Sequence, residues 1–119
     1  MKQFNLATGK LGEEIAKGYL EKKGFEIVEQ NYKTKYSEID IVAKQGKELV
    51  FVEVRTKIGE NFGSPEESLD KKKLRKLQFN ARSYIWKNRW KENYRIDAVC
   101  LVLKPDNSIE RLEHYENIC

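Results

Sequence analysis

The chain has 119 residues, of which 39% are hydrophobic and 35% are charged. This length provides one hydrophobic core, so we expect a single domain over residues 1–119, and the composition is typical of a soluble globular protein rather than a disordered chain. The longest apolar run, at 98–103, is too short to span a bilayer, and the start of the chain lacks the apolar core of a secretory signal. We therefore expect no membrane partner and a cytoplasmic location.

The sequence also restricts the kinds of metal site that the protein can hold. The two cysteines are Cys100, inside the apolar run, and Cys119, at the last position, so neither a disulfide framework nor a zinc site is predicted. The only histidine in the sequence is His114. Any metal would therefore be a hard cation bound by carboxylate oxygens.

The first half of the chain predicts a helix, a strand and a hairpin. Apolar residues recur at helical spacing from about residue 7 to 23, and Gly24 follows as a stop. Residues 25–32 alternate well enough for a strand. Residues 37–57, SEIDIVAKQGKELVFVEVRTK, form two apolar strands around a turn at 45–48, where Gly46 supplies the positive φ of a type II′ loop.

The second half predicts one more helix and two more strands. Ser64, Pro65 and Glu67 match a capping box, with Ser68 as a competing cap, and predict a helix from there to about residue 88. Its apolar stripe consists of Leu74, Leu77, Ala81, Tyr84 and Ile85. Strands follow at 94–103 and 109–115. The order of elements predicts an α/β fold in which helices flank a central mixed β-sheet containing an antiparallel hairpin.

The register of the predicted hairpin gathers charged residues on one face. With the turn at 45–48, the other face is wholly aliphatic, since it pairs Ile39 with Val54, Ile41 with Val52, and Ala43 with Val50. The charged face pairs Asp40 with Glu53 and Glu38 with Arg55. Directly opposed carboxylates, with Cβ atoms about 4.5–5.5 Å apart, destabilise a hairpin. Folding alone does not call for this arrangement.

Three things could relieve the repulsion between Asp40 and Glu53. These are a raised pKa on one carboxylate, a nearby cation such as Arg55 or Lys57, and a bound divalent metal. A hard cation such as Mg²⁺ is often bound by one or two carboxylates together with water and substrate phosphate. Asp40 and Glu53 are therefore the candidate metal ligands. The alternative is an ordinary solvated sheet face with surface ion pairs.

A basic segment accompanies the acidic hairpin. Residues 71–91 carry nine cations and no acid, so the rest of a chain with net charge +4 carries −5. A basic helix beside an acidic site predicts a polyanion partner such as nucleic acid, although a solvated lysine-rich helix face is the alternative. The candidate contacts are Lys57, Lys71, Lys72, Lys73, Arg75 and Lys76.

Three aromatic residues lie on the side of the second helix opposite its apolar stripe. Phe79, Trp86 and Trp90 fall about 180° from Leu74 on a helical wheel, if the helix extends that far. A second packing contact, including the seam of a homodimer, would explain them. Stacking against nucleic-acid bases is the other explanation.

These residues carry a resemblance to known nucleases. Asp40, followed after twelve residues by Glu53-Val54-Arg55, resembles the PD-(D/E)xK signature of restriction-endonuclease-like nucleases. The stretches LGEEIAKGYLEKKGFEIVEQNY, SEIDIVAKQGKELVFVEVRTK, FGSPEESLDKKKLRKL and YRIDAVCLVL together resemble the uncharacterised bacterial YraN-like family of predicted endonucleases, which is similar to archaeal Holliday-junction resolvases.

The resemblance implies a restriction-endonuclease-like sheet in which Asp40 and Glu53 bind Mg²⁺ or Mn²⁺. It also implies a catalytic role for Glu13 on the first helix. From the residues alone, Glu13 either borders the buried stripe or pairs with Lys17 one turn later. Glu38 either pairs with Arg55 or supports the ligands of the metal.

Two residues depart from the superfamily pattern. Arg55 occupies the usual lysine position, and Ser37 stands where a glycine commonly precedes Glu38. Arginine stays protonated in proteins, so Arg55 could orient phosphate or stabilise developing charge but could not act as a general base.

The residues and the resemblance together predict metal-dependent hydrolysis of phosphodiester bonds, in DNA rather than RNA, and the resemblance implies branched recombination or repair intermediates as candidate substrates. One alternative is a nucleic-acid-binding module that keeps the nuclease fold without cleavage. Another is a protein-interaction domain that uses the tryptophan-bearing face.

Overall fold

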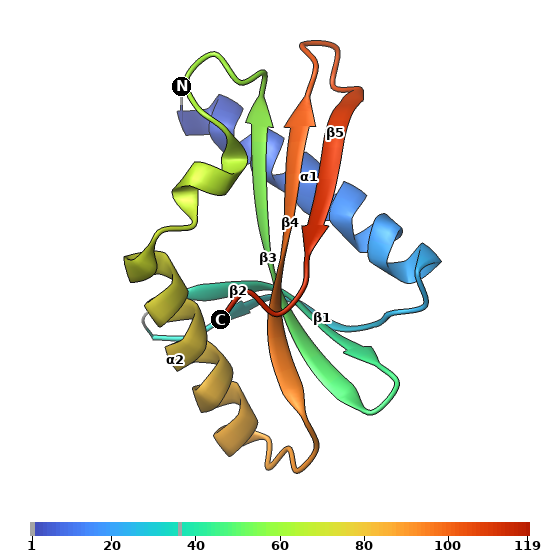
Figure 1. The fold of residues 1–119 in the computed structure, drawn as a ribbon, viewed down its shortest axis with the longest axis vertical. Coiled ribbons are helices and arrows are strands. Elements are labelled where there is room, and N and C mark those ends of the chain that lie inside the picture. The colour runs from blue at the N-terminus through green and yellow to red at the C-terminus, as the bar shows by residue number, and fades with distance from the viewer. Residues whose placement is uncertain (1, 36) are drawn as a thin grey trace.

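The computed structural model describes residues 2–35 and 37–119 (Figure 1). Within them lie the helices α1 (Lys2–Lys22) and α2 (Lys71–Lys87), the short 3-10 helix η1 (Pro65–Ser68), and the strands β1 (Glu26–Lys33), β2 (Glu38–Gln45), β3 (Glu48–Ile58), β4 (Tyr94–Leu103) and β5 (Ile109–Tyr115). The five strands form one sheet in the order β1-β2-β3-β4-β5. Only the β3–β4 pair of this sheet is parallel. The predicted α/β fold with a mixed sheet is confirmed, and it is consistent with a restriction-endonuclease-like core.

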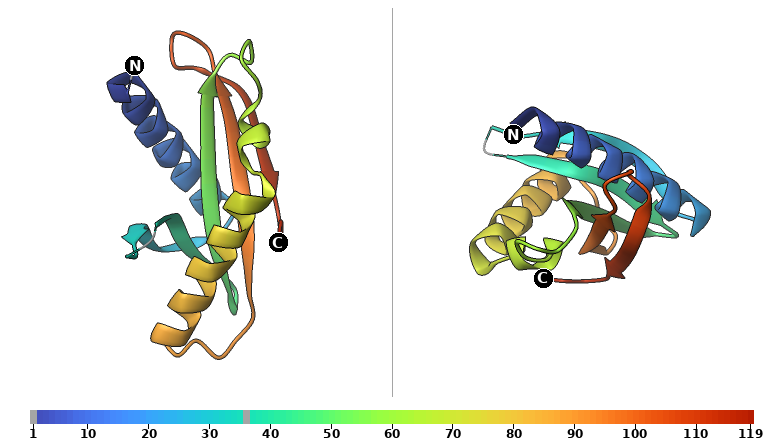
Figure 2. Two further views of the ribbon diagram at one scale, coloured as in Figure 1. Left: turned by 90° about the vertical axis from the view of Figure 1, so that its left-hand side faces the viewer. Right: turned by 90° about the horizontal axis from the view of Figure 1, so that it is seen from above.

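The two α-helices cover opposite faces of the sheet, as the right-hand view of Figure 2 shows. On the α1 side, Ala16 and Leu20 are fully buried against aliphatic side chains of β2, β3 and β4. Gly24 ends this helix with a φ of +93°, a conformation that glycine adopts without strain. The predicted stripe and stop of the first helix are therefore confirmed.

On the α2 side, Leu77, Ala81 and Tyr84 are buried against the sheet, while Leu74 and Ile85 are partly buried beside them. The predicted stripe of the second helix is therefore also confirmed. The start of this helix was predicted too early, because the chain forms η1 and α2 as separate elements.

A local hydrogen bond explains where α2 begins. Ser64 makes no side-chain capping bond, whereas the Asp70 carboxylate accepts from the Lys73 backbone N–H at 2.8 Å. A carboxylate at this position satisfies one of the unpaired N–H groups of the first turn. Asp70 is therefore the N-cap of α2. Trp90 lies beyond the end of the helix and packs against the α2-side core.

The hairpin has the predicted register near its turn and departs from it farther out. Gln45 pairs with Glu48, and the pairing continues to Ile41 opposite Val52. Beyond this pair β2 leaves β3, and Figure 1 shows it running steeply across that strand. The predicted aliphatic face is therefore wrong at its outer end, because Ile39 packs into the core on the α2 side. The predicted cross-strand pairings of Asp40 with Glu53 and of Glu38 with Arg55 are also absent from the ladder.

Ser37, the residue in place of a common glycine, joins the start of β2 to α2. Its backbone N–H donates to the Thr34 hydroxyl at 3.0 Å, and its own hydroxyl accepts from the buried side chain of Asn80. The side chain that glycine would lack is thus used for a contact with α2.

Helix α1 approaches β3 unusually closely at Gly12. A β-carbon at this position would lie 1.8 Å from the Thr56 hydroxyl oxygen, far inside van der Waals contact. The missing side chain of Gly12 therefore sets the distance between α1 and the sheet. None of the helices in the described ranges has the length and apolar character needed to cross a membrane.

Candidate metal centre

Three carboxylates from two elements converge where α1 passes the start of β2. Glu13 projects from α1, and Glu38 and Asp40 project from β2. One oxygen from each carboxylate lies within 4.8 Å of the others. Glu13, which is far from the hairpin in the sequence, is therefore placed at the acidic site.

Asn31 joins two of these acids and was not predicted from the sequence. Its side-chain amide donates to Glu13 at 2.8 Å and to Glu38 at 3.0 Å. The residue has a φ of +50°, a conformation that asparagine tolerates better than most side chains. The alternation of residues in β1 does not indicate that Asn31 contacts these acids, because only the packing of α1 brings Glu13 within reach of β1.

The negative charge at this site is incompletely balanced by protein groups. Burial raises the pKa of Asp40, and the neighbouring Glu53 carboxylate raises it further, to about 8, although the Val54 N–H donates to Asp40 at 2.8 Å. Burial likewise raises the pKa of Glu13, against the effect of its bond from Asn31. A site that resists ionisation of its own carboxylates is one that a bound cation would stabilise.

Glu53 lies beside Asp40 but differs from it in its partners. Its side chain is 4% exposed, and its Oε2 atom lies 2.9 Å from Arg55 Nη2 and 3.4 Å from Lys73 Nζ. Arg55 thus pairs with the acid two positions before it on β3, and not with Glu38. Its Nε–H is buried and finds no acceptor among the residues that the structure describes. An oxygen from outside the protein could accept from this donor only if the Arg55 side chain turned.

The predicted nucleic-acid contacts separate into two groups. Lys73 is partly buried and reaches Glu53 from the first turn of α2, so it belongs to the acidic site as well as to the basic helix. Lys57 is partly buried on β3. The other four are exposed at the same end of α2, namely Lys71, Lys72, Arg75 and Lys76. Their contact with nucleic acid stays a prediction.

The donor set fits a hard divalent cation. Mg²⁺ and Mn²⁺ prefer oxygen ligands, and Glu13, Glu38 and Asp40 offer carboxylate oxygens within one small space. Glu53 lies next to this space, with one oxygen held by two cationic side chains. The group of carboxylates that could hold a metal therefore extends beyond the predicted pair of Asp40 and Glu53 to Glu13 and Glu38.

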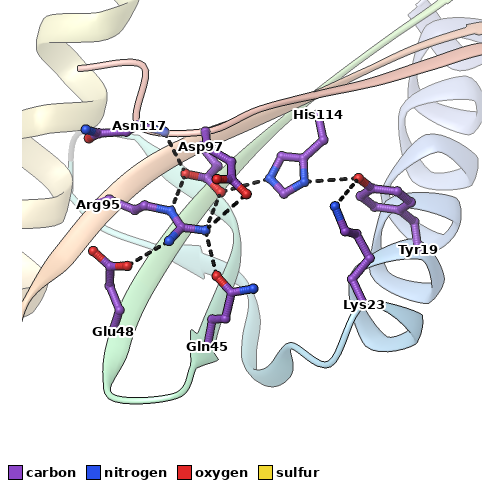
Figure 3. A network of polar contacts seen from close by, with 9 residues as sticks. Tyr19, Lys23, Gln45, Glu48, Arg95, Asp97, His114 and Asn117 are labelled. Carbon is purple, nitrogen blue, oxygen red and sulfur yellow. Dashed lines mark hydrogen bonds and ion pairs between the residues drawn. The ribbon is translucent and has the colours of Figure 1, made fainter.

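A second group with suitable ligand atoms, Asp97, His114 and Glu116, is built differently. Asp97 accepts hydrogen bonds from Arg95 at 2.9 Å and from the Asn117 backbone N–H at 2.9 Å, and His114 Nε2 lies 2.8 Å from it. Figure 3 shows these contacts continuing through His114 to Tyr19 on α1. Arg95 also lies 3.7 Å from Glu116. A protein cation thus already occupies the position between the two carboxylates, and this network is structural.

We expect Asp97→Asn to destabilise the protein by about 3 kcal/mol, because it leaves the partly buried Arg95 without its main charge partner. Burial alone would raise the pKa of Asp97, but hydrogen bonds from His114 and Arg95 outweigh it and lower that pKa. Chemical denaturation at pH 7 measures the loss. Unchanged stability would show that solvent compensates Arg95 as well as Asp97 does.

The sequence is similar to a family of bacterial proteins. The model of the uncharacterised protein family UPF0102 matches residues 12–101. A UPF0102 protein from Thermotoga petrophila is 44% identical over 109 residues, which cover 92% of this chain and 94% of the relative. Another, from Caldanaerobacter subterraneus subsp. tengcongensis, is 40% identical over 98% of both chains. The chain therefore belongs to the uncharacterised protein family UPF0102.

Proposed function

We propose that this protein is a divalent-metal-dependent nuclease of the restriction-endonuclease-like superfamily. It hydrolyses phosphodiester bonds in nucleic acid, DNA in preference to RNA, with branched recombination or repair intermediates as candidate substrates. The observation that carries the proposal is the acidic site itself, where Glu13, Glu38 and Asp40 meet with undercompensated charge beside Glu53. Bringing these carboxylates together costs stability in the absence of a cation, and the site suits a cation that in turn binds phosphate.

Each side chain has a role that follows from its position. Glu13, Glu38 and Asp40 would hold Mg²⁺ or Mn²⁺, with Glu53 beside them. The bound ion would lower the pKa of a water molecule and offset the charge of the phosphate. Arg55 lies beside Glu53 and its side chain is 28% exposed, so its guanidinium could turn to donate to a phosphate oxygen and stabilise charge that develops there. As an arginine, it does not remove a proton.

The alternative of a nucleic-acid-binding module without cleavage has one observation in its favour. Arg55 and Lys73 both lie on the same oxygen of Glu53, which weakens this carboxylate as a metal ligand. If these pairs persist when nucleic acid binds, phosphate would be held without hydrolysis. Binding that needs no metal and gives no product, with any of the substrates below, would favour this module.

We expect Glu13→Gln to lower both the affinity for metal and the rate of cleavage by about 10-fold to 100-fold. The matched control is Glu14→Gln, because Glu14 is the next residue of α1 but is exposed and contacts Gln30 instead. Calorimetric titration with Mn²⁺ measures metal affinity. Cleavage is measured on four-way-junction, duplex and single-stranded DNA and on RNA, with Mg²⁺, Mn²⁺ or EDTA.

Two outcomes would contradict the proposal. One is cleavage that survives both Asp40→Ala and Glu53→Ala, which would place the activity elsewhere. The other is equal Mn²⁺ affinity in Glu13→Gln and Glu14→Gln, which would remove the acidic site as the place of metal binding.

A further inference from the structure

The end of α2 far from the acidic site carries an exposed tryptophan in a positively charged hollow. Trp86 is 84% exposed. The hollow has a volume of about 690 Å³, and its charged lining consists of Arg82, Lys87, Arg89 and Lys91. Among the lining residues that the structure describes, none is acidic. The surface therefore combines a flat aromatic ring with charged side chains that are all positive.

Trp86 and Trp90 play different parts in this hollow. Trp90 packs against the core, and its indole N–H donates to the Asn93 carbonyl at 3.0 Å. It is therefore held in place by the fold. Trp86 buries little of its ring, although exposing a large aromatic side chain to water is unfavourable. Phe79, 55% exposed, lies two helical turns earlier on the same side of α2.

The backbone at Arg89 gives a second, independent observation. Arg89 directly follows the C-cap Asn88 and has a φ of +53°, in the left-handed region. Helices usually end here in glycine, and sometimes in asparagine. The other non-glycine residues described with positive φ are all asparagines, at 31, 107 and 117. The positive charge of Arg89 suits the negative end of the helix dipole, but the left-handed backbone conformation does not favour a long side chain at this position.

We infer that this hollow binds an unpaired segment of nucleic acid, with a base stacked on Trp86 and phosphates held by Arg89 and its neighbouring cations. An exposed ring can stack on an unpaired base, whereas the bases inside a duplex are already stacked on one another. Trp86 is 13 residues from Lys73, or about 20 Å along the helix, so the hollow lies well away from the acidic site. The inference rests on the proposed function, because it places a single-stranded part of the same substrate.

Charge argues against a second copy of the chain as the occupant. A two-fold contact through this face would bring the same cations of both copies together. Like charges at an interface are repulsive, and lysine is depleted in the centre of protein interfaces. A polyanion with exposed bases can stack on the Trp86 ring and pair with the positively charged side chains.

The test is the binding of an oligothymidine of about 12 nucleotides and of a blunt duplex of equal length, in EDTA, followed by fluorescence anisotropy. We expect Trp86→Ala to weaken oligothymidine binding about 10-fold and duplex binding much less, and Trp86→Phe to restore most of the affinity. Ile109→Ala on β5, another exposed apolar side chain, is the control and should change neither.

Arg89→Asn provides a variant that is not expected to harm the fold. Its melting temperature should be unchanged or higher, because asparagine suits the left-handed conformation. Its affinity for oligothymidine should fall about 3-fold. The slope of log affinity against log salt concentration should become shallower by the amount expected for the loss of about one phosphate contact. Lys104→Asn, in the turn between β4 and β5, is the matched loss of an exposed cation and should have little effect.

Three results would overturn the inference. They are equal oligothymidine affinity in Trp86→Ala and the unmodified protein, equal losses for oligothymidine and duplex, and a dimer in light scattering that Trp86→Ala dissociates. The last would assign the face to a contact between copies. Oligothymidine binding is measured without metal. A failure to observe cleavage would therefore contradict the nuclease proposal but would not affect the conclusion about binding at Trp86.

Discussion

Asp40→Asn is expected to reduce metal-dependent cleavage by more than about 100-fold while making the metal-free protein more stable. The loss follows because an amide is a poor substitute for a carboxylate ligand. The gain follows because asparagine removes a charge that is buried beside Glu53 and keeps an oxygen to accept the Val54 N–H. Since Asp40 is only partly buried, we expect a gain of about 2 kcal/mol at pH 8.

The gain in stability depends on pH with a definite sign. The pKa of Asp40 is raised from 3.8 to about 8 on folding, so the folded protein holds a proton that the unfolded chain releases between these values. The unmodified protein should therefore lose stability, relative to Asp40→Asn, as pH rises from about 4 to about 8. Below this window both states are protonated and the two proteins should be equally stable.

Urea denaturation in EDTA at pH 4 and pH 8 measures this difference, and adding Mg²⁺ should shrink it by stabilising the unmodified protein alone. Asp106→Asn is the control, because Asp106 is exposed and hydrogen bonds from Ser108 lower its pKa. A difference between the Asp40 proteins that does not change with pH would show that the Asp40 charge is already balanced.

Gly12→Ala is expected to destabilise the protein by about 2–3 kcal/mol and to abolish cleavage with it. The new methyl group would lie 1.8 Å from the Thr56 hydroxyl oxygen and 2.8 Å from its Cβ, so α1 must move away from β3. Glu13 is the next residue, and it would be carried away from Glu38 and Asp40. Thermal unfolding and the Mn²⁺ titration measure the two effects.

The same helix provides the controls for this substitution. Gly9 and Gly18 have open space where a side chain would be added, so Gly9→Ala and Gly18→Ala should be neutral or stabilise by up to about 1 kcal/mol. Thr56→Gly removes the atoms that clash, and the double variant should regain metal binding. A Gly12→Ala protein as stable as Gly18→Ala would show that the close approach is not needed.

Much of the fold can be predicted from the sequence because its signals are local. Strand alternation, the turn at Gly46 and the stop at Gly24 each depend on neighbouring residues, and the structure has all of them. The start of α2 was missed because a serine and an aspartate a few residues apart both have the chemistry of a cap. Which of them acts as the cap depends on how the chain leaves η1.

The acidic site could be predicted only in part, for a different reason. Asp40 and Glu53 are close because they share a hairpin and lie directly beyond the last pair of its ladder. Glu13, Asn31 and Lys73 reach the site from three other elements, at distances that only packing decides. The resemblance to a nuclease family implies a role for Glu13, but no residue pattern points to Asn31 or separates Lys73 from its neighbours.

The Asp70 cap and the stripe of α2 that packs on the sheet together set where the side chains of this helix point. Successive residues of a helix differ by about 100° in direction, so the packed face determines the direction of every other side chain. With the helix begun at Lys71, Lys73 faces Glu53 and Trp86 faces solvent. Loss of one residue before the cap shortens a loop, whereas loss of one residue between Lys73 and Trp86 would rotate these two side chains by about 100° relative to each other, so that both could not keep their present directions.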